Sequence, residues 1–517
     1  MLTSSSNATI ICKIMAYTIG IDIGTYSAKG VLLDESGRLL ASGSAAHELS
    51  MPRPGWAEHD AETDWWGGFV TICRGLLKES GIDPRAVLAV GVSGIAPCVL
   101  PVDEGGRALR PAILYGVDTR ATAEIDLLEE RLDREWIRET SGAYLSSQSA
   151  GPKILWLRER EPEIWNRTRW IMNSSTYLAY RLTGEVALDN YTAAFYHPLF
   201  DVTGRSWDEK AAKAICPVEM LPKTIWSGDA VGEVLQSAAA ETGLAPGTPV
   251  IAGSADASVE AVAAGVRTPG DTMVMYGSSN FLITVTEELR SGGAYWPAPF
   301  LWEGTFAYAG GMATAGSVTT WFRNNLARAG GGETSNGDAL YQALATEAAA
   351  VAPGSNGLLA LPYFSGERTP MNDPRARGVF AGLSLSHGRG HIFRSLLEGV
   401  GFGIRQNLEA MGALGGRLFG IGGGTKNDLW MQIVTDIIGE PQLLRDSPGA
   451  SFGDAVLGAL HAGILGSRED VEGWLPAPRE IRPDSRNRDV YDRQYELFKK
   501  LYENTTDTVH ALAEEQK

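Results

Sequence analysis

Apolar and polar residues alternate in short runs at the start of the chain. Three runs, Tyr17–Gly24, Lys29–Asp34 and Arg38–Ser42, are rich in residues that favour β-strands. A Gly-Thr turn follows the first run, and a turn that ends in Gly37 precedes the third. This pattern predicts a three-stranded β-meander that opens the protein.

Apolar residues at helical spacing follow, with strand-like runs between them. The predicted helices are Thr63–Leu77, Gly151–Glu161 and Asn166–Leu182, and the predicted strand is Val87–Ser93. Helices that alternate with strands in this way favour an α/β fold, in which helices cover the faces of a sheet.

The opening pattern returns in the second half of the chain. Pro249–Ser258 predicts a strand and a turn, and Thr272–Tyr276 and Asn280–Thr286 predict two strands around a Gly-Ser-Ser turn. Later elements are predicted helices at Thr314–Arg328 and Ser395–Met411 and a strand at Arg417–Ile421. We interpret the second half as a diverged copy of the first. The expected organisation is a disordered leader at residues 1–15 and two domains at residues 16–256 and 257–517.

The charged tail from Arg468 ends in an amphipathic helix. Its aromatic residues Tyr491, Tyr495, Phe498 and Tyr502 follow at i, i+4, i+7 and i+11, so they share one face. An aromatic face of this kind either packs into a core or binds a partner. Core packing is the more common outcome, and we expect it here.

Composition and charge narrow the functions that this fold can have. The 517 residues are 44% hydrophobic and 21% charged, which is typical of a globular protein with a sizeable core. There are 45 Lys and Arg against 62 Asp and Glu, and the resulting net charge of -17 repels nucleic acid and anionic lipid. Any phosphate must therefore be held locally, by backbone amides or by a metal ion.

Cysteine usage and hydropathy favour a cytoplasmic protein without membrane contact. The four cysteines, Cys12, Cys73, Cys98 and Cys216, include no Cys-x-x-Cys pair, which argues against a disulfide framework and a cysteine zinc site. The most apolar long window, Ala86–Leu100, contains polar and turn residues and is too short to span a bilayer.

The first candidate for chemistry is the turn after the first predicted strand. Gly24 would let backbone amides approach a phosphate, and Thr25 and Ser27 add hydroxyl donors. Asp22, at the end of the strand, can hold a hydrated Mg²⁺ against the same phosphates. The alternative is an ordinary hairpin, in which Asp22 and Gly24 only shape the turn.

The second candidate is Asp256, which lies between an apolar strand and the predicted helix Ser258–Ala264. A carboxylate that faces a cleft from such a place can accept a proton from a substrate hydroxyl during phosphoryl transfer. The alternative is that Asp256 caps the helix, and its position alone favours the cap.

Two further glycine turns each follow a predicted strand, Gly277-Ser278-Ser279 and Gly422-Gly423-Gly424-Thr425-Lys426-Asn427. Neither fits the dinucleotide pattern Gly-x-Gly-x-x-Gly or the Walker A pattern, which disfavours a Rossmann or P-loop nucleotide site. The joint order of the turns is more informative than any one of them, because they occupy equivalent strand ends of the two proposed halves.

These motifs together resemble the FGGY carbohydrate kinases, which share a two-domain architecture with actin, hexokinase and the chaperone ATPases. The likeness covers about Tyr17 to Ile464. It rests on DIGTYSAKGVLLDESGRLL, SAGPKILWLREREPEIW with YRLTGE, GTPVIAGSADASVEAVAAG, YFSGERTPMNDPRARGVFAGLSLSH and IGGGTKNDLWMQIVTDIIGEP. Within the family the chain most resembles the xylulokinases. The resemblance implies two actin/hexokinase-like (ribonuclease H-like) α/β domains with a cleft between them.

The resemblance also implies roles for matching positions. Asp256 is the expected catalytic base, and Asp22 the expected ligand of Mg²⁺. The expected ATP-binding residues are Gly24 and Thr25 in the first phosphate turn, Gly277 and Ser278 in the second, and Gly310, Gly311, Gly423, Gly424 and Asn427 along the nucleotide. The cleft is expected to close over sugar and ATP and to exclude water.

The sugar site departs from the family pattern. Xylulokinases carry Ser-Gly-Gln-Met-His-Gly where this chain has Ser-Gly-Ile-Ala-Pro-Cys, so Ala96 stands where a Met contacts the sugar. A lost imidazole removes a hydrogen-bonding partner for a hydroxyl, which can change specificity. Asp118 and Arg120 resemble the family's Asp-x-Arg loop and are expected at the sugar; the alternative is a surface ion pair.

The expected function is transfer of the γ-phosphoryl group of ATP to a hydroxyl of a small, xylulose-like ketose. One alternative is the same chemistry on glycerol, ribulose, gluconate or a sugar alcohol. The other is a non-catalytic nucleotide-binding module, because actin and the chaperones show that the architecture can serve assembly or switching. The sequence leaves the oligomeric state open, including a homodimer.

Overall fold

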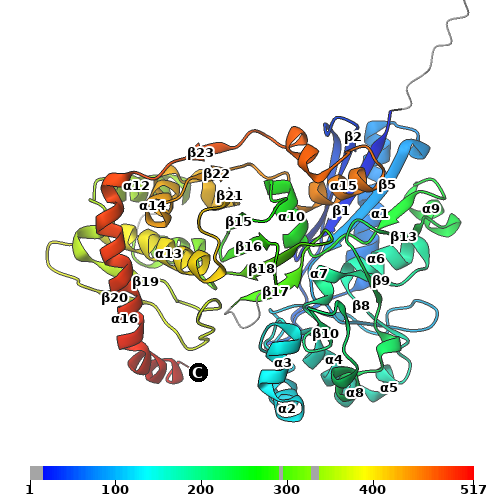
Figure 1. Ribbon diagram of the computed structural model, residues 1–517, viewed down its shortest axis with the longest axis horizontal. Coiled ribbons are helices and arrows are strands. Elements are labelled where there is room, and N and C mark those ends of the chain that lie inside the picture. The colour runs from blue at the N-terminus through cyan, green and yellow to red at the C-terminus, as the bar shows by residue number, and fades with distance from the viewer. Residues whose placement is uncertain (1–14, 290–294, 328–336, 517) are drawn as a thin grey trace, which may run out of the picture.

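Two mixed β-sheets, each flanked by helices, form the two halves of the protein (Figure 1). The computed structural model describes residues 15–289, 295–327 and 337–516. The predicted two-domain architecture with a cleft is confirmed. No helix in the described ranges is long and apolar enough to cross a membrane.

The first sheet begins with the predicted meander. Its strands are β1 (Tyr17–Ile23), β2 (Ser27–Asp34) and β3 (Leu39–Ala46), paired antiparallel. The other edge of β1 pairs in parallel with β5 (Val87–Gly94), and β14 (Pro249–Ile251) and β13 (Ala230–Glu233) complete the sheet. The strand order is β13-β14-β5-β1-β2-β3.

The second sheet repeats this topology, which confirms the internal duplication. The meander is β15 (Asp271–Tyr276), β16 (Asn280–Thr286) and β18 (Phe306–Gly310), and β17 (Trp296–Pro299) extends it. The strand β21 (Arg417–Ile421) pairs in parallel with β15, as β5 does with β1. The strands β22 (Gln442–Leu444) and β23 (Arg479–Ile481) follow.

Helices and short strands surround the sheets. The helices are α1 (Gly67–Ser80), α2 (Thr122–Leu132), α3 (Arg134–Ser141), α4 (Ala150–Arg160), α5 (Pro162–Trp165), α6 (Ser174–Thr183), α7 (Asn190–Ala193), α8 (Glu209–Ile215), α9 (Gln236–Thr242), α10 (Asp256–Ala264), α11 (Gly316–Asn325), α12 (Gly337–Ala349), α13 (Arg389–Met411), α14 (Asp428–Ile438), α15 (Ala450–His461) and α16 (Arg488–Glu514). The short strands are β4 (Glu58–His59), β6 (Leu100–Val102), β7 (Ala112–Ile113), β8 (Trp170–Met172), β9 (Ala187–Asp189), β10 (Phe200–Asp201), β11 (Ser206–Trp207), β12 (Lys223–Ile225), β19 (Leu359–Leu361) and β20 (Val379–Ala381).

Helix α15 comes from the second half of the chain but packs against the first sheet (Figure 1). Glycines make this close approach possible. A Cβ atom on Gly20 of β1 would lie 1.9 Å from the carbonyl oxygen of Ser451, and one on Gly91 of β5 would lie 2.4 Å from that of Asp454. The chain thus returns to its first half after completing the centre of the second sheet, and the boundary at residue 256 stays a prediction.

One predicted helix is wrong. Asn166–Leu182 was expected to be continuous, but it contains β8 and then the shorter α6. Trp170–Met172 pairs antiparallel with β6, a contact with a segment about 70 residues earlier that helical spacing cannot reveal. Helix α13 begins at Arg389, earlier than Ser395. The leader at residues 1–14 and Arg328, the predicted end of one helix, lie outside the described residues.

The aromatic face of the C-terminal helix is confirmed as core. Tyr491, Tyr495 and Phe498 on α16 are buried, and Tyr502 packs at the edge of the same cluster. The helix runs along the outer side of the second half, as Figure 1 shows.

Candidate active site

The carboxyl ends of three parallel strands bring the main predicted residues to one edge of the first sheet. The amide of Ile95 donates to the carbonyl of Ile23 at 2.8 Å, and Gly94 forms a parallel bridge with Ala255. Ligands of open α/β sheets bind at this kind of edge. The turn after β1, the Ala96 loop after β5 and Asp256 after β14 are therefore neighbours.

Asp256 is the first residue of α10 and does not cap it. The residue at the N-cap position is Ala255, whose side chain makes no capping hydrogen bond. Asp256 Oδ1 accepts from the adjacent amide of Ala257 at 2.7 Å. Burial raises the pKa of Asp256. The cap interpretation is therefore wrong, and the carboxylate is available for other contacts.

Three acidic side chains share this edge. Burial, the charge of Asp256 and that of Glu260 raise the pKa of Asp22 to about 8, against the opposing effects of Ser93 and Lys29. Burial and Asp256 raise the pKa of Glu260 to about 7. Glu260 lies one turn after Asp256 on α10, a spacing that could have found it from the sequence. Such crowding of carboxyl groups favours the protonated form of one or more of them.

The first glycine turn combines a tight bend with free donors. The amide of Gly24 donates to the carbonyl of Ser27 at 3.0 Å, which closes the turn. Thr25 Oγ1 lies 2.9 Å from the hydroxyl of Tyr115, so its hydroxyl also faces the neighbouring loop. Asp256 contributes to the raised pKa of Tyr115, after burial. Tyr115 thus contacts the turn and lies near enough to Asp256 to be affected by its charge, a neighbour that sequence reasoning missed.

The second glycine turn lies at the matching place in the second sheet. The amide of Gly277 donates to the carbonyl of Ser279, and the carbonyl of Ser278 accepts from the amides of Ala315 and Ser317 at the start of α11. A Cβ on Gly424 would lie 2.8 Å from Cβ of Tyr276, so the triple-glycine turn is adjacent. The structure brings both turns together at the carboxyl ends of β15 and β21.

The remaining nucleotide candidates differ in their surroundings. Gly423 is exposed, with open space where a side chain would be. Asn427 caps α14 by accepting from the amide of Trp430 at 3.1 Å. Gly310 and Gly311 are buried, and the amide of Gly311 donates to Thr369 Oγ1 at 2.6 Å. The two buried glycines therefore have a packing role, and their contact with a nucleotide stays a prediction.

Asp118 and Arg120 form a buried ion pair, so the surface interpretation is wrong. Both side chains are fully buried, and Arg120 Nε and Nη2 donate to the Asp118 carboxylate at 2.7–3.0 Å. Arg120 Nη1 lies 2.8 Å from Glu58, and its guanidinium stacks 3.9 Å from the centre of the Trp56 ring. The guanidinium of Arg120 therefore contacts protein side chains, whereas Asp118 also borders a cavity.

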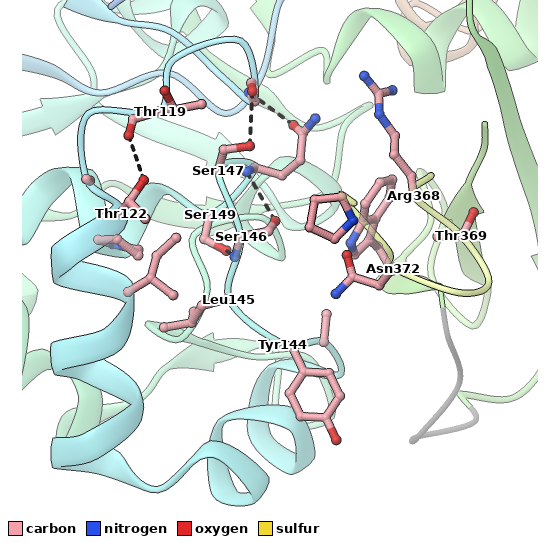
Figure 2. Close-up of a pocket in the computed structure, with 18 of the residues that line it drawn as sticks. Thr119, Thr122, Tyr144, Leu145, Ser146, Ser147, Ser149, Arg368, Thr369 and Asn372 are labelled. Carbon is pink, nitrogen blue, oxygen red and sulfur yellow. Dashed lines mark hydrogen bonds between the residues drawn. The ribbon is translucent and has the colours of Figure 1, made fainter. Parts of the chain in front are cut away.

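A cavity of about 610 Å³ lies between the two halves. On one side is the loop that carries Tyr144 and Leu145, and on the other are Arg368, Thr369 and Asn372 (Figure 2). Asp118 and Gln148 also line the cavity. Lys153 also borders it, but its ammonium donates to three backbone carbonyls at 2.6–2.8 Å. The guanidinium of Arg368 has no ion-pair partner among the described residues. Polar side chains from both halves line the cavity, which suits a hydroxylated ligand.

No group of three or more His, Cys, Asp or Glu side chains in the described residues is arranged to hold a metal ion. Asp22 Oδ1 accepts from Ser93 at 3.1 Å, and its Oδ2 has no hydrogen-bond partner within the same ranges. This single free carboxylate oxygen fits an ion that arrives with phosphate oxygens as its other ligands.

The duplicated sheets and the cleft between them define a two-domain α/β protein of the actin and hexokinase architecture. The model of the FGGY family of carbohydrate kinases, N-terminal domain, matches residues 17–263, and that of the C-terminal domain matches residues 272–462. The chain belongs to the FGGY family of carbohydrate kinases.

Individual relatives agree with this assignment. A xylulose kinase of Escherichia coli K12 is 31% identical over 500 residues, which cover 94% of this chain and 98% of that protein. A xylulose kinase of Bacillus subtilis 168 is 29% identical over 507 residues, or 96% and 99% of the two chains. The crystal structure of xylulose kinase from Rhodospirillum rubrum superposes with a TM-score of 0.88 at 31% identity, and covers 96% of this chain and 100% of that one.

Proposed function

We propose that the protein is an ATP-dependent kinase that phosphorylates a hydroxyl of a small, xylulose-like ketose in the cytoplasm. The observation that carries the proposal is the position of Asp256. It begins α10 at the edge where the first glycine turn lies, near enough to Asp22 and Tyr115 to raise their pKa values. The similarity to xylulose kinases over nearly the whole chain supports the choice of a ketose.

Each residue has one task in this mechanism. Asp256 accepts the proton of the acceptor hydroxyl, and its raised pKa makes it a stronger base than an exposed carboxylate. The turns at Gly24 and Gly277 direct amides and hydroxyls to the phosphates. Asp22 holds Mg²⁺, which when bound offsets negative charge on the phosphoryl oxygens.

The acceptor occupies the cavity between the halves in this proposal. Asp118 would accept from its hydroxyls. Ala96 and Asp256 lie at the strand ends outside the lining, so the reacting hydroxyl would have to extend from the cavity to that edge. Arg120 fixes the orientation of Asp118 through their two-pronged contact. The buried geometry of this pair supports a positioning role for Arg120, whose guanidinium contacts Asp118, Glu58 and Trp56.

A panel assay tests the proposal. Purified protein is given Mg-ATP with pentuloses, hexuloses, polyols or aldonates in turn, and ADP release is measured against a sample without acceptor. Stimulation by a ketose supports the proposal. Stimulation only by glycerol, a sugar alcohol or gluconate moves the substrate to the second candidate class. Nucleotide binding without stimulation by any acceptor favours the non-catalytic module instead.

A further inference from the structure

Two histidine side chains donate hydrogen bonds to backbone carbonyls of the first glycine turn. His47 Nε2 donates to the carbonyl of Gly24 at 2.9 Å, and His59 Nε2 donates to the carbonyl of Thr25 at 3.0 Å. The two imidazole rings meet edge to face, with their centres 4.8 Å apart. Consecutive carbonyls of the turn are therefore fixed by one pair of side chains.

Because peptide units are planar, these hydrogen bonds to carbonyls also fix the direction of the following amide N–H groups. In a trans peptide the carbonyl and the following N–H point in opposite directions, and both peptides concerned are trans. Because the carbonyls of Gly24 and Thr25 face the histidines, the amides of Thr25 and Tyr26 face away from them. Neither amide donates a hydrogen bond to any described residue. Two adjacent free amides of this kind can bind an anion.

Trp65 determines which nitrogen of His59 carries the proton. Its Nε1 donates to His59 Nδ1 at 3.2 Å, so the proton of the neutral ring must lie on Nε2, which faces Thr25. His59 and Trp65 are both fully buried. Burial and the nearby His47 lower the pKa of His59 to about 4, so the neutral ring persists near neutral pH.

We propose that His47 and His59 are positioning residues that direct the amides of Thr25 and Tyr26 at the phosphates of the nucleotide. The inference rests on the proposed function, because it takes this turn to be a phosphate-binding turn. The histidines act through the backbone and do not touch the nucleotide. Without their N–H donors the two peptide planes lose the bonds that hold their amides on the ligand side.

Variants at His59 separate this role from simple packing. His59→Leu removes the N–H donor. His59→Gln keeps an N–H donor at about the same distance from the backbone as Nε2 of His59. In the full chain, His59→Leu should weaken Mg-ADP binding by about fivefold to tenfold in calorimetry and raise the KM for ATP similarly, with the KM of the acceptor unchanged. His59→Gln should restore most of the affinity. His47→Leu, at a half-buried position, should act in the same direction if His59→Leu does not fold.

His461 supplies a matched control. Its Nδ1 bonds the carbonyl of Gly228 at 2.9 Å, the same kind of contact at the far end of α15, so His461→Leu should leave Mg-ADP affinity unchanged. Unchanged affinity in folded His59→Leu and His47→Leu overturns the inference. Equal losses for nucleotide and acceptor, not restored by Gln, overturn it in favour of a scaffold role. A wild-type protein that binds no Mg-ADP overturns the proposed function, and the inference with it.

Discussion

Ser93 Oγ lies 2.5 Å from Oδ2 of Asp454, a residue 361 positions later in the chain. The same hydroxyl lies 3.1 Å from Oδ1 of Asp22. A hydroxyl has one proton and cannot donate to both carboxyl groups. Asp454 is fully buried, and burial together with the charges of Asp22 and Asp256 raises its pKa well above the usual range. Ser93 can therefore donate to only one of the two carboxyl groups at a time, and the raised pKa of Asp454 favours its neutral form beside Asp22.

This arrangement predicts how Asp454→Asn changes stability with pH. An Asp whose pKa is raised in the folded state costs stability increasingly as pH rises above its unfolded value of 3.8. Asn has no such cost. The Tm of the variant minus that of the wild type should therefore increase as pH rises from about 5 to about 8. Thermal unfolding across this range measures the difference. The exposed Asp507→Asn is the control, and a difference that does not change with pH would contradict a raised pKa of Asp454.

Asp256→Asn should lower kcat by ~10²–10⁴-fold while the protein stays folded. Asn keeps the shape and can still accept from the amide of Ala257, but it cannot take the proton of the acceptor. ADP release at saturating substrates measures the loss, and the Tm shows whether the fold is intact. Near wild-type turnover in a folded variant would remove Asp256 from the mechanism.

Asp22→Ala should weaken the response of ATP use to Mg²⁺ and leave acceptor binding largely intact. The reason is that Oδ2 of Asp22 has no hydrogen-bond partner among the described residues and is the expected metal ligand, whereas the proposed acceptor site is the cavity that Asp118 borders. Calorimetric titration with the acceptor and then with Mg-ATP tests both halves of the prediction. If both affinities fell together, damage to the meander would be the better explanation.

Glu260→Gln should move the acidic limb of the kcat/KM profile for Mg-ATP to lower pH. Glu260 is one of the groups that raise the pKa of Asp22, after burial and Asp256. Asp22 must be ionised to hold the metal, so activity falls as pH drops through its pKa, and a lowered pKa lets activity persist further into acid. A pH series on the wild type and the variant measures the limb. A limb that moves toward alkaline pH, or stays in place, would contradict the assignment.

The sequence was sufficient to place the candidate residues that lie at strand ends. Gly24, Asp256 and Gly277 each follow a β-prone run, so local pattern predicted their positions, and their roles stay predictions. It could not find Asp454, which reaches Ser93 only because α15 returns to the first sheet. Nor could local pattern exclude the surface ion pair that was the alternative for Asp118 and Arg120, since the burial of Arg120 depends on Trp56 and Glu58 from a distant segment.

The departure at Ala96 predicts the choice of acceptor. Similarity to xylulose kinases indicates that a five-carbon ketose is near the right size. The Met and His expected at the sugar are absent, however, and Asp118 and Gln148 are among the polar residues that line the cavity. We therefore expect D-xylulose to be used weakly or second best, with a related ketose or sugar alcohol preferred. One changed hydrogen bond alters transition-state binding by ~1–3 kcal/mol, which is enough to reorder closely related acceptors.

Ranking kcat/KM over pentuloses, hexuloses, polyols and aldonates measures this preference. A wide lead for D-xylulose would show that the substitution is neutral, because the remaining groups then suffice to hold its hydroxyls.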